Sequence, residues 1–229
     1  MSEAEAFEYA ARYRTRRAID AMRDRFETGE VLVYWRYGFS HYDDARGWFF
    51  RQPGGLVVRS YDLFGGEPLL RDELFERLEG PRPVVVAAAA GDVAAIERAV
   101  TVAAGDAAAM LDRELAAELA VRLDRAASFT ALLASAGLDH DARVRLLHVA
   151  AARGRASAIS ALLASGVAAD AAAPRQQTAL VSAVFGAHLD AVATLLDAGA
   201  DPDRAQPGGT TARGFARDPR IIDLLTRCR

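Results

Sequence analysis

The stretch that decides the fold reads TALVSAVFGAHLDAVATLLDAGADPD, from Thr178 to Asp203. It begins with apolar residues at helical spacing, breaks at Gly186-Ala187, and continues with a second apolar series that ends at Gly199. Threonine is a common residue at helix N-termini and glycine is common just beyond helix C-termini. The pattern therefore predicts two short helices joined by a tight turn, the second running from about Leu189 to Ala198.

Similar units occur elsewhere in the second half of the chain. The segment ALLAS stands at 131–135 and again at 161–165, and a third version begins at Thr194. The units start near Arg82, Leu115, Arg145, Thr178 and Thr211, at spacings of 33, 30, 33 and 33 residues. A nearly fixed period of this length indicates stacked repeats, because one unit alone cannot bury its apolar face.

The run from Thr178 to Asp203 resembles an ankyrin repeat, whose pattern is T-P-L-H-x-A-A followed by G-H, V-V, L-L and G-A-D. The matching residues here are Thr178, Leu180, Ala183, His188, Val192, Leu195, Leu196, Gly199, Ala200 and Asp201. The sequence departs from the pattern at the proline, replaced by Ala179, and at the motif histidine, replaced by Val181. The resemblance covers about residues 82–229. It implies a mostly α fold, a helix-turn-helix solenoid of about four to five repeats with a shortened C-terminal capping repeat.

Residues 1–80 have a different composition, since they contain 15 of the 18 aromatic residues. Gly80-Pro81-Arg82-Pro83 is typical of a helix end followed by a rigid turn, so we expect domains at 1–80 and 82–229. The first should be a small α+β domain that resembles no family known to us. Its expected elements are a helix over 4–27, strands at 30–37, 48–51 and 56–61, and a helix over 67–80.

Composition excludes several classes of protein. The chain has 52% hydrophobic residues and a net charge of -3, which fits a packed globular protein and argues against a nonspecific nucleic-acid binder. The single cysteine, Cys228, cannot form an internal disulfide, which favours a reducing compartment. No secretory signal is visible, and the longest apolar run, VVVAAAA at 84–90, is too short to span a membrane. We expect a cytoplasmic protein with neither a membrane nor a nucleic acid as its partner.

Candidate catalytic chemistry is sparse. His41, Asp43 and Asp44 could bind a metal or exchange protons, but adjacent positions rarely converge on one ligand, so a solvated hairpin loop is the preferred interpretation. Neither a phosphate-binding glycine loop nor a nucleophile triad can be placed. His148 and His188 fall at ankyrin-like positions that imply a loop-bracing role. We therefore expect no catalytic, cofactor-binding or metal-binding residues.

The resemblance implies a nonenzymatic protein-protein interaction module whose partner binds the concave face of the array. Carried onto this sequence, that face comprises Asp141, Val144, Arg153, Arg175, Gln177 and Phe185. The preceding unit aligns less well and would add Glu114 and Arg122.

Two alternatives remain open. The N-terminal domain could be an enzyme or a ligand-binding unit that the ankyrin arm targets, with the aromatic residues of 34–50 lining a pocket. The protein could also be a bacterial immunity or antitoxin-like inhibitor of a toxin.

Overall fold

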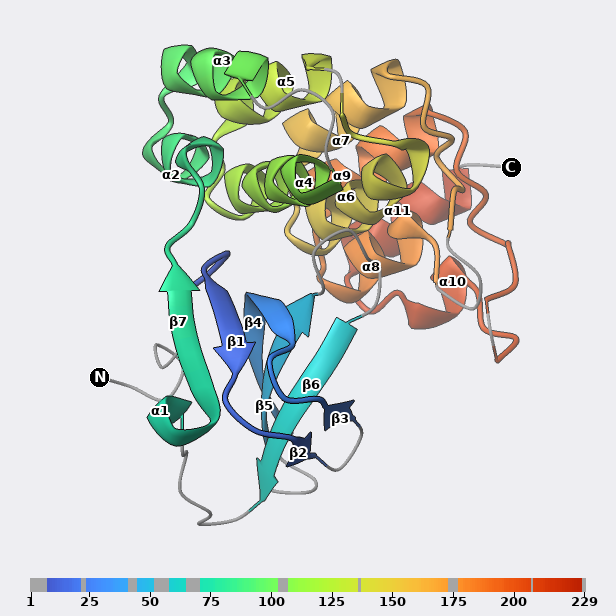
Figure 1. Ribbon diagram of the computed structural model, residues 1–229. Coiled ribbons are helices and arrows are strands. Elements are labelled where there is room, and N and C mark those ends of the chain that lie inside the picture. The colour runs from blue at the N-terminus through green and yellow to red at the C-terminus, as the bar shows by residue number, and fades with distance from the viewer. Residues whose placement is uncertain are drawn as a thin grey trace. The chain divides into compact units, whose positions relative to one another are not determined.

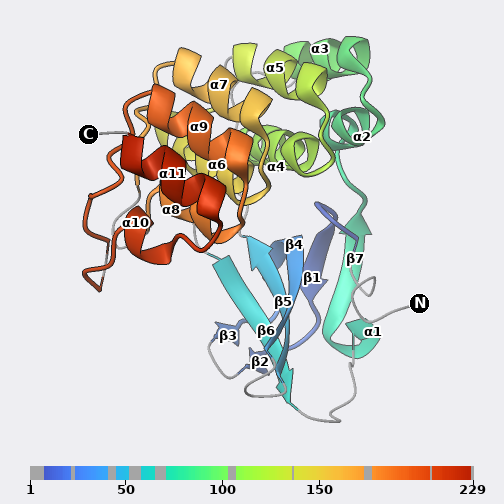
Figure 2. The ribbon, with the colours of Figure 1, turned by 180° about the vertical axis from the view of Figure 1, so that it is seen from behind.

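The computed structural model describes residues 8–21, 24–40, 45–51, 58–64, 71–102, 107–135, 137–172, 177–206 and 208–227 (Figures 1 and 2). The chain divides into two compact units. The first combines Met1–Val86 with Ala103–Leu115, and the second combines Ala87–Val102 with Ala116–Arg229. The expected single boundary near residue 81 lies close to the first crossing. A single boundary leaves out residues 103–115, which belong to the first unit again. The start of helix α4 (Ala107–Arg122) is therefore part of the first unit.

The first unit contains a five-stranded antiparallel sheet in the order β6-β5-β4-β1-β7. Its strands are β1 (Arg12–Thr15), β4 (Val31–Ser40), β5 (Ala45–Arg51), β6 (Val58–Phe64) and β7 (Phe75–Glu79). A second, two-stranded sheet pairs β2 (Ile19–Asp20) with β3 (Arg25–Phe26), and the one-turn helix α1 (Arg71–Leu74) precedes β7. The first and last strands of the large sheet are therefore neighbours, although about sixty residues separate them.

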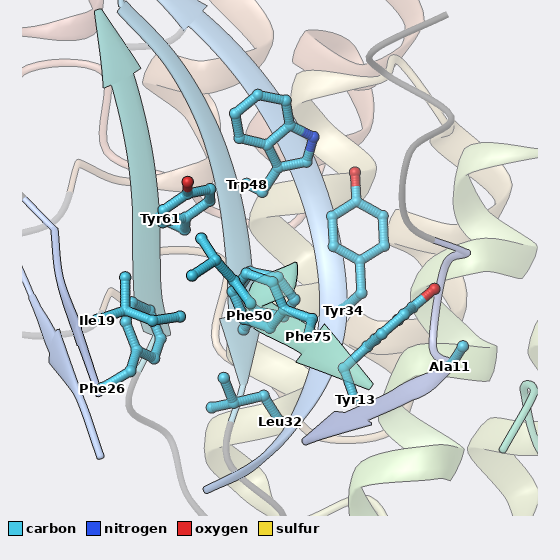
Figure 3. Close-up of a cluster of buried hydrophobic side chains, with 11 residues drawn as sticks. Ala11, Tyr13, Ile19, Phe26, Leu32, Tyr34, Trp48, Phe50, Tyr61 and Phe75 are labelled. Carbon is cyan, nitrogen blue, oxygen red and sulfur yellow. The ribbon is translucent and has the colours of Figure 1, made fainter. Parts of the chain in front are cut away.

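The aromatic residues of the first unit form its core (Figure 3). Trp48 and Phe50 are two residues apart on β5, so both side chains point to the same face of the sheet, and both are fully buried. Phe50 stacks on Phe75 with ring centroids 5.3 Å apart and meets Tyr34 edge-on at 5.7 Å. Burial of these large rings supplies the main apolar stabilisation of the unit.

The helix expected over 4–27 is wrong wherever the structure describes it. Residues 12–15 form β1 instead, in which Tyr13 and Thr15 are buried and Arg14 between them is exposed. Tyr13 pairs with Leu32 of β4 and joins the aromatic core through Phe50, at a centroid distance of 6.5 Å. Burial of alternate side chains against these partners outweighs the helix propensity of the alanines and arginines.

The helix expected over 67–80 is also wrong within the described residues. Only the turn Arg71–Leu74 is helical, and the chain then continues as β7, which pairs with β1. The three predicted strands are confirmed as β4, β5 and β6, although β6 begins at Val58. The proposed turn at 52–55 lies outside the described residues.

Two buried ion pairs join the sheet to the start of α4 within the first unit. Arg12 Nη2 lies 2.9 and 3.0 Å from the carboxylate oxygens of Asp112, and Arg12 Nε lies 3.2 Å from Glu79. Arg51 forks onto Glu114 with Nη1–Oε1 and Nη2–Oε2 distances of 3.1 and 3.2 Å. Burial raises the pKa of the Asp112 carboxyl, and the hydrogen bond and charge of Arg12 offset this only in part. The N-terminal part of α4 is thus an integral element of the first unit.

The second unit is a stack of helices that continues to the C-terminal end of the described chain. Successive helices pair along the sequence as α2 with α3, α4 with α5, α6 with α7, α8 with α9, and α10 with α11. Their bounds are α2 (Pro83–Ala90), α3 (Val93–Val102), α5 (Ala126–Ala134), α6 (His140–Ala152), α7 (Ala156–Ala164), α8 (Ala179–Phe185), α9 (Leu189–Asp197), α10 (Ala212–Phe215) and α11 (Pro219–Arg227). The second helices pack in the series α3-α5-α7-α9-α11, and the first helices α6, α8 and α10 pack in the same way (Figure 2). This arrangement confirms the predicted helix-turn-helix solenoid.

One hydrogen bond recurs at the turn inside each of the first four pairs. A backbone N–H just after the turn donates to the carbonyl oxygen of an alanine five residues earlier. The four bonds are Asp92 to Ala87 (3.0 Å), Arg125 to Ala120 (2.8 Å), Arg155 to Ala150 (2.9 Å) and His188 to Ala183 (3.0 Å). The residue before each donor has a positive φ: Gly91 (82°), Asp124 (58°), Gly154 (66°) and Ala187 (55°). These positions repeat at 33, 30 and 33 residues, which are the spacings found in the sequence.

The unit from Thr178 to Asp203 folds as predicted. Its second helix, α9, ends one residue before the expected Ala198, and Gly199 follows with a left-handed φ of 86°. Thr178 occupies the N-cap position of α8, but its side chain makes no capping hydrogen bond. Its backbone N–H instead donates to Oε1 of Gln206 at 2.8 Å.

The Arg51–Glu114 pair yields a stability prediction. Glu114→Gln leaves a buried guanidinium without its counter-charge and should lower the free energy of unfolding by about 3–5 kcal/mol. The double variant Arg51→Met with Glu114→Leu should lose much less unfolding free energy, because neither charge is then left buried without its partner. Urea unfolding followed by tryptophan fluorescence reports on this unit, because both tryptophans belong to β4 and β5.

A matched control is the exposed pair Arg14–Glu76, whose atoms lie 3.7 Å apart. Glu76→Gln should cost less than about 1 kcal/mol. Equal losses for Glu76→Gln and Glu114→Gln would contradict a special role for burial.

The turns yield a second prediction. A Cβ at Gly199 would meet no atom within 4 Å, so Gly199→Ala should lose only about 1–2 kcal/mol through its left-handed backbone. A Cβ at Gly154 would lie 2.7 Å from Nδ1 of His188 in the next pair. Gly154→Ala should therefore lose more unfolding free energy than Gly199→Ala. Thermal unfolding followed by far-ultraviolet circular dichroism compares the two, and an equal loss would show that the packing of His188 on Gly154 is unimportant.

Candidate binding surface

Helix α8 exposes a single large side chain. Ala179, Leu180, Val181, Ala183 and Val184 are all buried. Of the rest of the helix, Ser182 is half-buried and Phe185 is 79% exposed, the highest exposure of any large hydrophobic side chain in the described residues. A phenylalanine with this exposure contributes little to the core of the fold, so Phe185 is the candidate centre of a binding surface.

The neighbouring helix α6 places small residues beside this phenylalanine. Positions 149 and 152 correspond to 182 and 185 after a shift of one 33-residue period, and α6 packs on α8. Val149 is half-buried and Ala152 is exposed. Nε2 of His188 lies 3.1 Å from the carbonyl oxygen of Ala152 and links the two helix ends. Val149 and Ala152 on α6 and Phe185 on α8 are thus incompletely buried apolar residues of two packed helices, here called the apolar strip.

Four of the six residues predicted for the binding face are exposed, namely Asp141, Arg153, Gln177 and Phe185. Arg175 lies outside the described residues. Val144 is wrong as a surface residue, because it is only 7% exposed. The reason is that α6 begins at His140, where Asp139 accepts a hydrogen bond from the backbone of Ala142 (2.7 Å), so position 144 lies inside the helix.

Glu114 and Arg122, which the preceding unit would add to the binding face, are not exposed in the structure. Glu114 is buried in its ion pair with Arg51, so it cannot contact a partner. Arg122 is half-buried, and its Nη2 lies 2.6 Å from Glu118.

The exposed residues do not form one cluster. Asp141 and Arg153 lie near opposite ends of α6, about 18 Å apart along the helix axis at 1.5 Å per residue. Gln177 precedes α8, whereas Phe185 ends it. Arg153 and Phe185 thus lie near one end of the helix stack, and Asp141 and Gln177 lie near the other.

The sequence prediction missed further residues at this end. Arg125 and Arg155 follow the turns of two adjacent pairs, and Val149 and Ala152 complete the apolar strip. An alignment of the repeats on their turns places residues 92, 125, 155 and 188 at equivalent positions. Such an alignment would have shown that Arg125 and Arg155 occupy the same position in adjacent pairs.

The loop-bracing role expected for the two histidines is confirmed. His148 Nε2 lies 3.2 Å from the carbonyl oxygen of Ala171, so this nitrogen carries the proton and donates it. Burial lowers the pKa of His148, and the hydrogen bond to Ala171 opposes this shift only in part. His188 connects two successive pairs through Ala152, as described above.

No metal site is found in the part of the chain that the structure describes, where no three potential ligands among His, Cys, Asp and Glu converge. His41, Asp43 and Asp44 lie outside that part. Among the described helices, none is both long enough and apolar enough to cross a bilayer.

Comparison with known proteins assigns the central part of the helical stack. The family described as ankyrin repeats matches residues 118–206 in three copies, and no family is assigned to the N-terminal region. A search of curated proteins gave no match.

The buried histidine yields a pH prediction. Because the folded pKa of His148 lies below its ordinary value near 6.5, its contribution to stability is complete above that value. It is lost as the pH falls through the folded pKa. Between pH 7.5 and 5, His148→Gln should therefore lose less unfolding free energy than the wild type, measured by urea unfolding at each pH. A variant with an unchanged pH dependence would contradict this assignment.

Proposed function

We propose, from the premise that residues 118–206 are ankyrin repeats, that this protein is a nonenzymatic module that binds a protein partner. Ankyrin repeats are generally protein-protein interaction modules. The partner binds the exposed side of the first helices, and the apolar strip around Phe185 is the centre of the contact. The observation that carries this proposal is the 79% exposure of Phe185.

The energetics of protein interfaces support this assignment. A few large side chains usually supply most of the binding energy, and aromatic residues and arginine are enriched among them. Phe185 offers apolar area, and Arg153 near the same end of the stack offers a planar fork of donors for carboxylates or carbonyls. The small side chains of Ala152 and Val149 let a partner approach the phenylalanine ring closely.

The core of the first unit bears on the enzyme alternative. Trp48, Phe50 and Tyr61 belong to the buried core of the first unit, in which Trp48 packs on Tyr61. A core role accounts for Tyr34, Trp48 and Phe50, three of the residues that could otherwise have lined a ligand pocket. The enzyme alternative then rests on His41, Asp43 and Asp44, which lie outside the described residues.

A capture experiment in the native host tests the proposal. Phe185→Ala should weaken capture of the partner about tenfold or more, because a hot-spot side chain is removed. Its stability should change by no more than about 0.5 kcal/mol, because the side chain is exposed. The matched control is Ile222→Ala on α11, which removes a hydrophobic side chain that is 46% exposed at another site.

The comparison of these two variants decides the outcome. Equal capture by the Phe185→Ala variant and the wild type would refute this binding surface. Loss of capture on changing His41, Asp43 or Asp44, with no effect at Phe185, would favour the N-terminal alternative.

A further inference from the structure

Two adjacent turns of the stack concentrate arginine. Residues 122–125 read Arg-Leu-Asp-Arg, and residues 152–155 read Ala-Arg-Gly-Arg. Arg155 joins the two turns, since its Nη1 lies 3.1 Å from Asp124 Oδ2 and its Nη2 donates to the carbonyl oxygen of Arg122 at 3.3 Å. We call these eight residues the basic edge.

The four arginines of the basic edge fall into two groups. Arg122 and Arg155 are half-buried and paired, with Glu118 and Asp124 respectively. Arg125 and Arg153 are exposed, and within the described residues their guanidinium groups form no hydrogen bond or ion pair. Glu118 and Asp124 are thus already engaged with the first group. The second group presents two forks of donors to solvent.

The stem of Arg125 is held close to the turn before it. A Cβ built at Gly91 would lie 3.6 Å from Arg125 Cδ, so the arginine side chain passes over the space that the glycine leaves open. This packing restricts the side chain and reduces the entropy that it would lose on binding.

The apolar strip lies beside the basic edge. His188, in the turn that follows Phe185, reaches back to the carbonyl oxygen of Ala152, the first residue of the second arginine turn. Positive charge and an exposed aromatic ring therefore occupy consecutive turns on one side of the stack. The edge is opposite in sign to the net charge of -3 of the whole chain.

We infer that the basic edge and Phe185 together bind an acidic polypeptide segment that carries a large apolar side chain. Carboxylates of the segment pair with Arg125 and Arg153, because a guanidinium fork matches a carboxylate in geometry and charge. The apolar side chain packs on Phe185 and Ala152. This inference rests on the proposed protein-binding function and specifies the chemistry of the partner.

The charge distribution favours a polypeptide over a nucleic acid. Nonspecific binding to a phosphate backbone draws on many cations, whereas this edge has two exposed guanidinium groups in a chain of acidic isoelectric point, about 5.8. A short segment with two or three acids needs no more than this, and the aromatic ring supplies the remaining affinity.

A random peptide library tests the inference. Sixteen-residue peptides are selected against the immobilised full-length chain, and the enriched peptides are then measured in solution by fluorescence anisotropy. We expect enrichment of Asp and Glu together with an aromatic or large aliphatic residue. Arg125→Glu, Arg153→Glu and Phe185→Ala should each weaken binding about tenfold or more, and added salt should weaken it further.

Matched controls are Arg98→Glu, which reverses an exposed charge on α3, and Ile222→Ala, and both should bind as the wild type does. Enriched peptides that lack acids, peptides that bind the Arg125→Glu and Arg153→Glu variants normally, or a failure to enrich any peptide would each overturn the inference. Binding of a labelled 20-nucleotide single strand that depends on the same arginines would overturn it in favour of a nucleic acid.

Failure of this inference is distinguishable from failure of the proposed function. If capture of the native partner depends on Phe185 but tolerates Arg125→Glu and Arg153→Glu, the protein-binding function stands and the acidic segment is wrong. If capture is independent of Phe185 as well, both are wrong.

Discussion

The stack depends on one hydrogen bond, made across each turn to the carbonyl oxygen of an alanine. The four acceptors are 0–6% exposed, and a larger side chain at any of them would separate neighbouring helix pairs. The bond fixes where the second helix of a pair begins, so the residue that follows each turn always faces the same edge. Arg155 and His188 occupy this position, and both reach back to the preceding turn. Repetition of one local constraint thus produces both the packing and the surface.

The helical stack could be predicted from the sequence because its determinants are local. Each pair needs a glycine or another residue that tolerates a left-handed turn, a buried alanine and two apolar stripes, and these recur at 33 and 30 residues. Which side chains of the stack are exposed to solvent was harder to predict. The burial of Val144 depends on where α6 begins, and with Asp139 at its N-cap the helix starts six residues before the position that the repeat alignment pairs with Ala179. Phe185 could be identified because the resemblance to an ankyrin repeat places it on the binding face, and in the structure it is 79% exposed.

The first unit shows the opposite behaviour, because its strands are specified by distant partners. Arg12, Tyr13 and Arg14 read as a helix face when they are taken alone. In the structure Arg14 forms an ion pair with Glu76 on the neighbouring strand β7 (3.7 Å), and Arg12 forms one with Asp112. Nothing in the local sequence reveals these contacts. The strand β4 was predictable, because its aromatic and β-branched residues favour extended backbone without help from a partner.

The buried ion pairs also bear on how the protein is made. Arg12 and Arg51 meet their carboxylates 100 and 63 residues further along the chain. During synthesis the sheet residues leave the ribosome well before Asp112 and Glu114 do. Until then the guanidinium groups of Arg12 and Arg51 lack the counter-charges that make their burial favourable. We expect the sheet to stay loosely packed until the first turns of α4 emerge. Folding of the first unit is thus expected to finish only after residues 103–115 have been synthesised.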